Sequence, residues 1–232
     1  MKILLTCFLL ISATIAGAQN SPVIATGAMR NTIFHGQTAG LLSVDSLTRP
    51  GMYGLGPLEE LRGELLLWDG NPYVATVDGP GAMILRTDSS VRAPFFVHQH
   101  VTEWLPVELP DTVQDLAGAD AFLTTWAAGS TAEPFAFTLV GAFTHLAVHV
   151  LDVPEGTRIA GPDDMRPHKP HFETNGDAQV LGFFSTRHHR VFTHHDSNIH
   201  AHALAVDGGF MGHVEELRFA ADKVELRVAL MR

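Results

Sequence analysis

Residues 198–214 read N-I-H-A-H-A-L-A-V-D-G-G-F-M-G-H-V, and this stretch decides much of the expected fold. Because side chains alternate between the two faces of a β-strand, His200 and His202 would share one face. A glycine-rich turn with Asp207, Gly208 and Gly209 follows, and His213 comes eleven residues after His202. The pattern predicts a hairpin whose first strand supplies two imidazoles and whose second strand supplies a third.

Three imidazoles around a divalent cation, with one coordination position left open, are typical of a catalytic zinc site rather than a structural one. The alternative is chance, because the chain contains 14 histidines. The third histidine beyond the turn favours the metal site, and we predict zinc as the cofactor. Copper, nickel or iron would accept the same ligands, so the sequence leaves the metal's identity open.

The first 18 residues predict an export signal. Lys2 precedes an apolar run over residues 3–15, and a small-residue cleavage site ends at Ala18. Cys7 is the one cysteine and lies in that run, so residues 19–232 contain neither a thiol nor a disulfide. We therefore expect an exported protein, periplasmic or secreted, that binds its metal through His, Asp or Glu.

Composition restricts the partners of the mature chain. A formal charge of −10 argues against a nucleic-acid-binding surface. No segment after the signal is apolar over a length that would cross a bilayer, so we expect no membrane partner in the mature form. A small-molecule substrate is the expected partner, and residues 19–232 suit one domain.

Strand signals dominate the chain, and strands are expected over residues 64–68, 73–77, 93–101, 135–139, 142–151, 179–184, 199–206, 214–219 and 224–231. Helical spacing predicts a helix over residues 112–126, with a short turn at 57–61 and a loop at 156–174. These segments predict an α+β fold of mostly antiparallel or mixed sheets in two intimately packed halves. We place a soft boundary near residue 130 and the metal hairpin in the C-terminal half.

Three further features involve ionisable residues. Glu64 begins an expected strand, and it is either an acid/base group near the metal or an exposed carboxylate at a strand end; the residues alone favour the exposed carboxylate. His98 and His100 repeat the H-x-H spacing without a third histidine nearby, so we predict packing or surface roles for them, with a second metal site as the alternative. A loop-like stretch holds four more histidines, which we expect to be solvated unless they tune the site: His188, His189, His194 and His195.

With these segments in place, the chain resembles the α-acetolactate decarboxylases. The resemblance rests on G-L-G-P-L-E-E-L-R-G-E-L-L-L-W-D-G at 54–70, Y-V-A-T-V-D-G at 73–79, A-P-F at 93–95, P-F-A-F at 134–137, V-G-A-F at 140–143, L-G-F at 181–183 and the H-x-H…G-H-V hairpin. The hairpin is the most specific of these motifs, because its ligands and its spacing both match.

The resemblance implies a carboxy-lyase that converts 2-acetolactate to acetoin and carbon dioxide through a metal-stabilised enediolate. It implies zinc on His200, His202 and His213, with Glu64 at the active site. It also implies a homodimer.

The chain departs from the family pattern at three places. The family arginine that meets the substrate corresponds to His149, which lacks a bidentate fork and a permanent charge. A family threonine ahead of the G-E-L strand corresponds to Pro57, and a glutamate near the family's C-terminus has no counterpart. Arg187 or Arg92 is a candidate replacement for the missing cation.

Other functions stay open at this stage. The same site would suit a metal-dependent lyase, isomerase or hydrolase acting on another small oxo-acid or a sugar. A non-catalytic metal-binding protein would also fit the extra histidines. Cupins use an H-x-H strand as well, but they need a glutamate soon after it, which residues 203–206 do not supply.

Overall fold

The computed structural model describes residues 19–130 and 133–230. The expected export signal and its cleavage site lie outside these residues, so export stays a prediction. The elements, in chain order, are β1 (Ile24–Thr26), α1 (Met29–His35), β2 (Leu42–Ser43), η1 (Val44–Leu47), β3 (Met52–Pro57), η2 (Glu59–Leu61), β4 (Glu64–Trp68), β5 (Asn71–Val77), β6 (Met83–Thr87), β7 (Arg92–Ala93), β8 (Phe96–His100), β9 (Leu105–Val107), α2 (Leu116–Ser130), β10 (Phe135–His149), α3 (Pro162–Met165), η3 (Arg166–His168), β11 (His171–Phe184), β12 (Ile199–Ala205) and β13 (Met211–Ala229).

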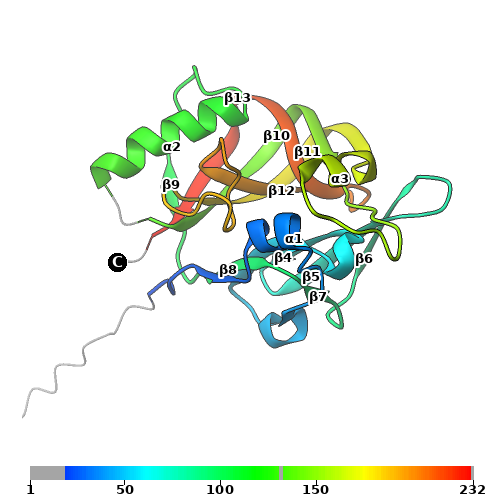
Figure 1. Ribbon diagram of the computed structural model, residues 1–232. Coiled ribbons are helices and arrows are strands. Elements are labelled where there is room, and N and C mark those ends of the chain that lie inside the picture. The colour runs from blue at the N-terminus through cyan, green and yellow to red at the C-terminus, as the bar shows by residue number, and fades with distance from the viewer. Residues whose placement is uncertain (1–18, 131–132, 231–232) are drawn as a thin grey trace, which may run out of the picture.

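Two antiparallel sheets stack against each other, as Figure 1 shows. The N-terminal sheet has the order β1-β8-β3-β4-β5-β6, and the C-terminal sheet has the order β10-β11-β12-β13-β9. In the C-terminal sheet β10 also pairs with β13, so this sheet closes on itself. The mostly antiparallel α+β fold is confirmed.

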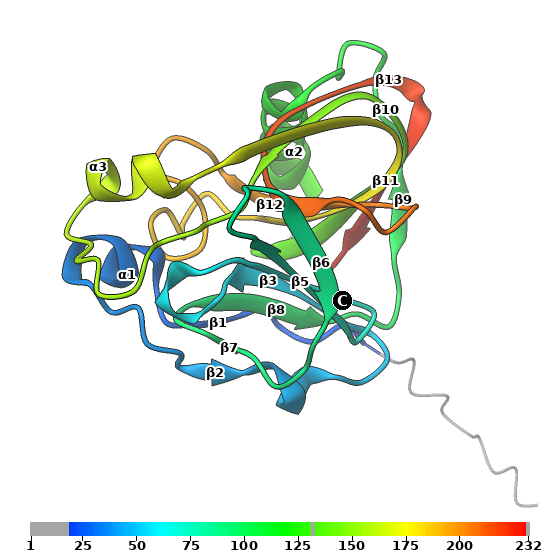
Figure 2. The ribbon, with the colours of Figure 1, turned by 90° about the vertical axis from the view of Figure 1, so that its right-hand side faces the viewer.

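The chain passes from one sheet to the other between β8 and β9, ahead of the boundary expected near residue 130. Helix α2 packs on the C-terminal sheet, on the side away from the N-terminal sheet, and the view in Figure 2 shows the same order of layers. The division into two halves of one domain over residues 19–232 stays a prediction. No helix among the described residues has the length and apolar character needed to cross a bilayer.

The alternation of side chains along β4 positions the functional site. Leu66 packs in the core between the two sheets, together with Leu181 of β11 and Leu204 of β12. Leu65 and Leu67 face the opposite side of the N-terminal sheet, where a separate apolar cluster lies. Glu64 has the same parity as Leu66, so its side chain is directed toward the C-terminal sheet.

Several expected boundaries were wrong. The strands expected at 135–139 and from residue 142 onward are one strand, β10, which ends at His149. Those expected at 214–219 and from residue 224 onward are one strand, β13, which ends at Ala229, because bulges absorb the irregular stretches. The stretch 156–174 contains α3 and the start of β11, and so is not all loop. Helix α1 was missed, since its 7 residues are too few for a visible helical period.

Candidate metal centre

The strand register places histidines directly opposite one another. His202 of β12 pairs with His213 of β13, and His213 in turn pairs with His149 of β10. His149 also pairs with His171 of β11. Side chains at directly opposed positions have Cβ atoms about 5 Å apart, so the register brings these imidazoles together before any side-chain detail is considered.

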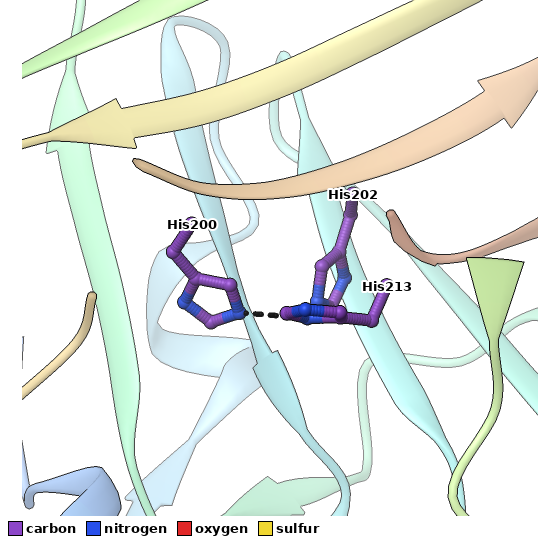
Figure 3. A group of neighbouring side chains, drawn as sticks. All are labelled: His200, His202 and His213. Carbon is purple, nitrogen blue, oxygen red and sulfur yellow. Dashed lines mark hydrogen bonds between the residues drawn. The ribbon is translucent and has the colours of Figure 1, made fainter. Parts of the chain in front are cut away.

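His200, His202 and His213 converge, as the sequence spacing predicted. Each offers a ring nitrogen, and these nitrogens lie within 4.8 Å of one another. His200 Nε2 and His213 Nδ1 are 3.1 Å apart, and Figure 3 shows the three rings directed toward a common space. All three side chains are buried, so the hairpin delivers three nitrogens to one interior point.

The protonation state of the three rings suits a metal. Burial lowers the pKa of His202 to about 3, and it lowers the pKa of His200 and of His213 well below the usual value. The rings are therefore neutral at pH 7 and keep lone pairs for coordination. Among the described residues, neither ring nitrogen of His202 has a hydrogen-bond partner. Buried polar atoms without partners are costly, so this donor set fits a divalent transition metal such as zinc.

Glu64 lies beside the triad. Its Oε2 is 3.5 Å from His202 Nε2, its Oε1 is 3.6 Å from His149 Nε2, and its side chain is 2% exposed. The exposed-carboxylate interpretation was therefore wrong. Burial raises the pKa of Glu64 well above its ordinary value, although Lys169 acts in the opposite direction. Glu64 can thus carry a proton at a pH where exposed glutamates are ionised.

His149 occupies the interior of the site, held by an acid that the sequence analysis missed. Its Nδ1 lies 2.5 Å from Glu215 Oε1. Burial lowers the pKa of His149 to about 4, and hydrogen bonding to His149 holds the pKa of Glu215 at about 2. The carboxylate can only accept, so Nδ1 carries the proton and Nε2 faces Glu64 with a lone pair. The alternation of β13 offered a signal, because Glu215 follows His213 by two residues.

His194 also reaches the centre. Its Nε2 lies 3.0 Å from Nε2 of His213, which corrects the expectation of a solvated histidine. Its neighbours behave differently: His188 contacts Ser185, His189 contacts Asn198, and His195 is exposed beside Asp196. Sequence proximity alone could not separate His194 from these three.

A cavity of about 50 Å³ adjoins the triad and admits only a small ligand. Glu64, His149 and Lys169 line it, together with an apolar wall that includes Met29 and Phe95. Neither candidate replacement for the family arginine lines it. Arg92 donates to the Gly40 carbonyl, and Arg187 is engaged with Glu133. Lys169, which the sequence analysis did not single out, is the cation in the wall.

His98 and His100 do not join this centre. Neither belongs to a group of potential metal ligands among the residues that the structure describes. The predicted packing role fits His98, which is 8% exposed with its ring 6.3 Å from that of Phe96.

Solved structures that share this fold include the following three. The alpha-acetolactate decarboxylase from Bacillus subtilis strain 168 aligns with a TM-score of 0.73 and 16% identity, over 91% of this chain and 86% of that chain. The acetolactate decarboxylase from Bacillus subtilis subspecies spizizenii gives 0.73 and 15%, over 91% and 87%. A Staphylococcus aureus protein of unknown function, similar to alpha-acetolactate decarboxylase, gives 0.71 and 15%, over 91% and 87%.

Two comparisons at the level of sequence gave different results. Among curated proteins, none matches the chain in sequence. The family model named Alpha-acetolactate decarboxylase, however, matches residues 26–232. Family and fold together support a decarboxylase, a carbon-carbon lyase acting on a small molecule. The resemblance drawn from the motifs is confirmed, and the chain belongs to the alpha-acetolactate decarboxylase family.

Proposed function

We propose that this protein is an exported, zinc-dependent decarboxylase that converts 2-acetolactate to acetoin and carbon dioxide. The observation that carries the proposal is the convergence of His200, His202 and His213, with Glu64 beside His202 and in the wall of the adjoining cavity. The cavity's small volume suits a short oxo-acid. We also propose export after cleavage at Ala18, a single domain over residues 19–232 and a homodimer.

The three histidines would hold the metal through their neutral rings. Because they are only three protein ligands, one coordination position is left for substrate. A zinc ion bound there would supply Lewis-acid stabilisation of negative charge that develops on the substrate oxygens. Loss of carbon dioxide leaves an electron pair on the carbon that carried the carboxylate, and this carbon must take up a proton. Glu64 is the acid we assign to that step, because it lies beside the triad and burial raises its pKa, which favours the protonated form.

His149 would act on Glu64 and on bound substrate. Its Nε2 is directed at Glu64 Oε1, and Glu215 fixes the ring from the other side. Because the pKa of His149 is lowered to about 4, the ring is neutral at pH 7 and cannot replace the charge of an arginine. We therefore assign it hydrogen bonding and positioning, and we look elsewhere for a cation that meets the carboxylate.

One observation favours a second candidate, a metal-binding protein without turnover. His149, His213 and Glu215 form a further group whose ligand atoms lie within 4.8 Å of one another. A protein that used this group would bind more than one metal per chain, whereas the decarboxylase needs the triad alone. A lyase or isomerase acting on another small oxo-acid is the alternative that keeps the triad and Glu64.

The deciding experiment uses residues 19–232, purified and loaded with one equivalent of zinc. We expect acetoin from racemic 2-acetolactate, measured by colorimetry or gas chromatography, and none from His202→Ala above the uncatalysed rate. Stoichiometric zinc without acetoin would reject the substrate assignment. Turnover of a different oxo-acid by the same preparation would establish the alternative lyase, and two tightly bound metals with no turnover would favour the metal-binding protein.

A further inference from the structure

A second, larger pocket lies next to the metal cavity. Its volume is about 270 Å³, and three cationic side chains line it: Arg30, Lys169 and Arg190. The two cavities share parts of their walls, including Met29, Met165 and Lys169. Lys169 therefore belongs to the interior site and to the outer pocket at once.

Among the described residues, the three cations of this pocket form no close ion pair, although Lys169 interacts electrostatically with Glu64 and Glu215. Within the described residues, no ion pair or side-chain hydrogen bond involves Arg30, Lys169 or Arg190; the Arg190 guanidinium lies 5.8 Å from the centre of the Phe34 ring. The acids of α3 are engaged elsewhere, Asp163 with Arg166 and Asp164 with the Ala160 amide.

This concentration of positive charge is unusual for the protein. The chain has a formal charge of −10, so a pocket with three cations differs from the overall balance. A concave surface lined by one sign of charge raises the local concentration of oppositely charged ligands.

The backbone holds the two arginines in place. The Arg30 amide donates to the Arg190 carbonyl at 2.9 Å, and the Met29 amide donates to the Val191 carbonyl at 2.8 Å. These bonds join α1 to the segment that precedes β12. Arg190 itself has φ 61°, a left-handed conformation that non-glycine residues seldom adopt. The pocket is thus built by specific contacts between two segments distant in sequence.

We propose that this pocket is an anion-binding entrance that takes the carboxylate of a small organic acid. Arg30 and Arg190 form its outer part, and Lys169 passes the acid to the metal cavity. The apolar residues beside them, including Ile33 and Phe34, accept the carbon skeleton. Only one part of this assignment rests on the proposed function, namely that the acid bound in the pocket then moves to the metal.

The chemistry of decarboxylation indicates that these cations assist substrate binding rather than the chemical step. Negative charge leaves the carboxylate as carbon dioxide forms, so a cation beside the carboxylate stabilises bound substrate more than the transition state. An interaction that is weaker in the transition state lowers KM without raising kcat. Removing Lys169 should therefore raise KM without lowering kcat.

The first test needs no turnover. Binding of 2-hydroxy-2-methylpropanoate, a substrate-shaped carboxylate that lacks the oxo group, is measured by calorimetry on metal-free residues 19–232 at pH 7.5, with its uncharged amide as the reference. We expect the acid to bind and the amide to bind far less. Lys169→Gln should weaken acid binding about tenfold, and the double variant Arg30→Gln/Arg190→Gln about fivefold.

Matched variants separate charge from folding. Lys169→Arg should restore most of the binding, because the charge returns, and Arg86→Gln, an exposed arginine on β6, should leave the affinity unchanged. Equal affinity for acid and amide, or an affinity in Lys169→Gln within twofold of the parent, would overturn the proposal.

A second measurement keeps this proposal separate from the proposed function. On zinc-loaded protein, Lys169→Gln should raise KM for 2-acetolactate about tenfold and change kcat by less than threefold. If metal-free protein binds the acid through the three cations but zinc-loaded protein makes no acetoin, the anion pocket stands and the substrate assignment fails. A fall in kcat with unchanged KM would overturn the entrance role.

Discussion

The chain contains two H-x-H strands, and only one of them builds a candidate metal centre. His200 and His202 on β12 meet His213, while His98 and His100 on β8 meet no further ligand among the described residues. Both pairs lie on antiparallel strands within sheets, and both have the same spacing. The two strands therefore have the same local pattern. What differs is the part of the molecule that each pair of histidines faces.

The face of each strand decides the outcome. On β8, Val97 packs in the core between the sheets, so His98 and His100 share the opposite face with Phe96. On β12, Leu204 packs in the core between the sheets, and His200 and His202 share its parity. The β12 pair thus faces Glu64 on β4, whereas the β8 pair faces away from the C-terminal sheet. A shift of one residue in either strand would exchange these environments.

The largest contrast should follow removal of one histidine from each pair. His202→Ala should lose stoichiometric zinc and fall to the uncatalysed rate, a loss of about 10⁶-fold or more. His98→Ala should keep one zinc per chain and most of the activity, because its ring contributes packing only. Metal content after dialysis and acetoin formation measure the two effects. Equal zinc loss in both variants would contradict the difference between the strands.

A smaller loss of activity is expected when Glu64, the acid that faces the β12 histidines, is replaced. Glu64→Gln should retain zinc, since the three histidines remain, and should lower kcat by about 10²–10⁴-fold through loss of the proton donor. Glu225→Gln, an exposed carboxylate on β13, is the matched control and should leave kcat unchanged. If Glu64→Gln lost its zinc, Glu64 would be a ligand rather than an acid.

The smallest effect concerns the β8 pair and is a change in how the free energy of unfolding depends on pH. Burial lowers the pKa of His98 to about 4, against an unfolded value near 6.5. Between pH 6.5 and 4, His98 is therefore protonated in the unfolded chain and neutral in the folded protein. The free energy of unfolding falls as pH drops through this range. This group contributes a slope of at most about 1.4 kcal/mol per pH unit.

Urea denaturation of metal-free protein at several pH values between 4 and 7.5 measures this slope. His98→Gln should give a shallower dependence than the parent, because glutamine does not titrate. Identical slopes in the two proteins would mean that folded His98 takes up its proton as readily as the unfolded chain does.

Much of the candidate site was readable from the sequence because its ligands belong to one local hairpin. The spacing of His200, His202 and His213 requires only strand alternation and a turn, both of which are local properties. The Glu64–Trp68 strand and its D-G turn were found for the same reason. Strand boundaries within β10 and β13 were missed, because bulges interrupt the alternation while the pairing continues.

The residues that complete the site needed the tertiary structure. His194 and Lys169 lie in segments without a periodic pattern, and their positions depend on how those segments pack against α1 and the metal hairpin. Arg92 and Arg187 were the candidate cations in the sequence, yet they lie elsewhere and have other partners. A cation's distance from a pocket is a property of the packed chain and leaves no local signal.

By itself, the sequence determined the hairpin, the three imidazoles and the family, since each depends on residue type and short spacing. The tertiary structure decided which H-x-H pair faces the other sheet, how Glu64 becomes buried beside His149, and which cations gather at the entrance. The physical reason is that strand alternation fixes which side chains share a face, while only the stacking of the two sheets fixes what that face meets.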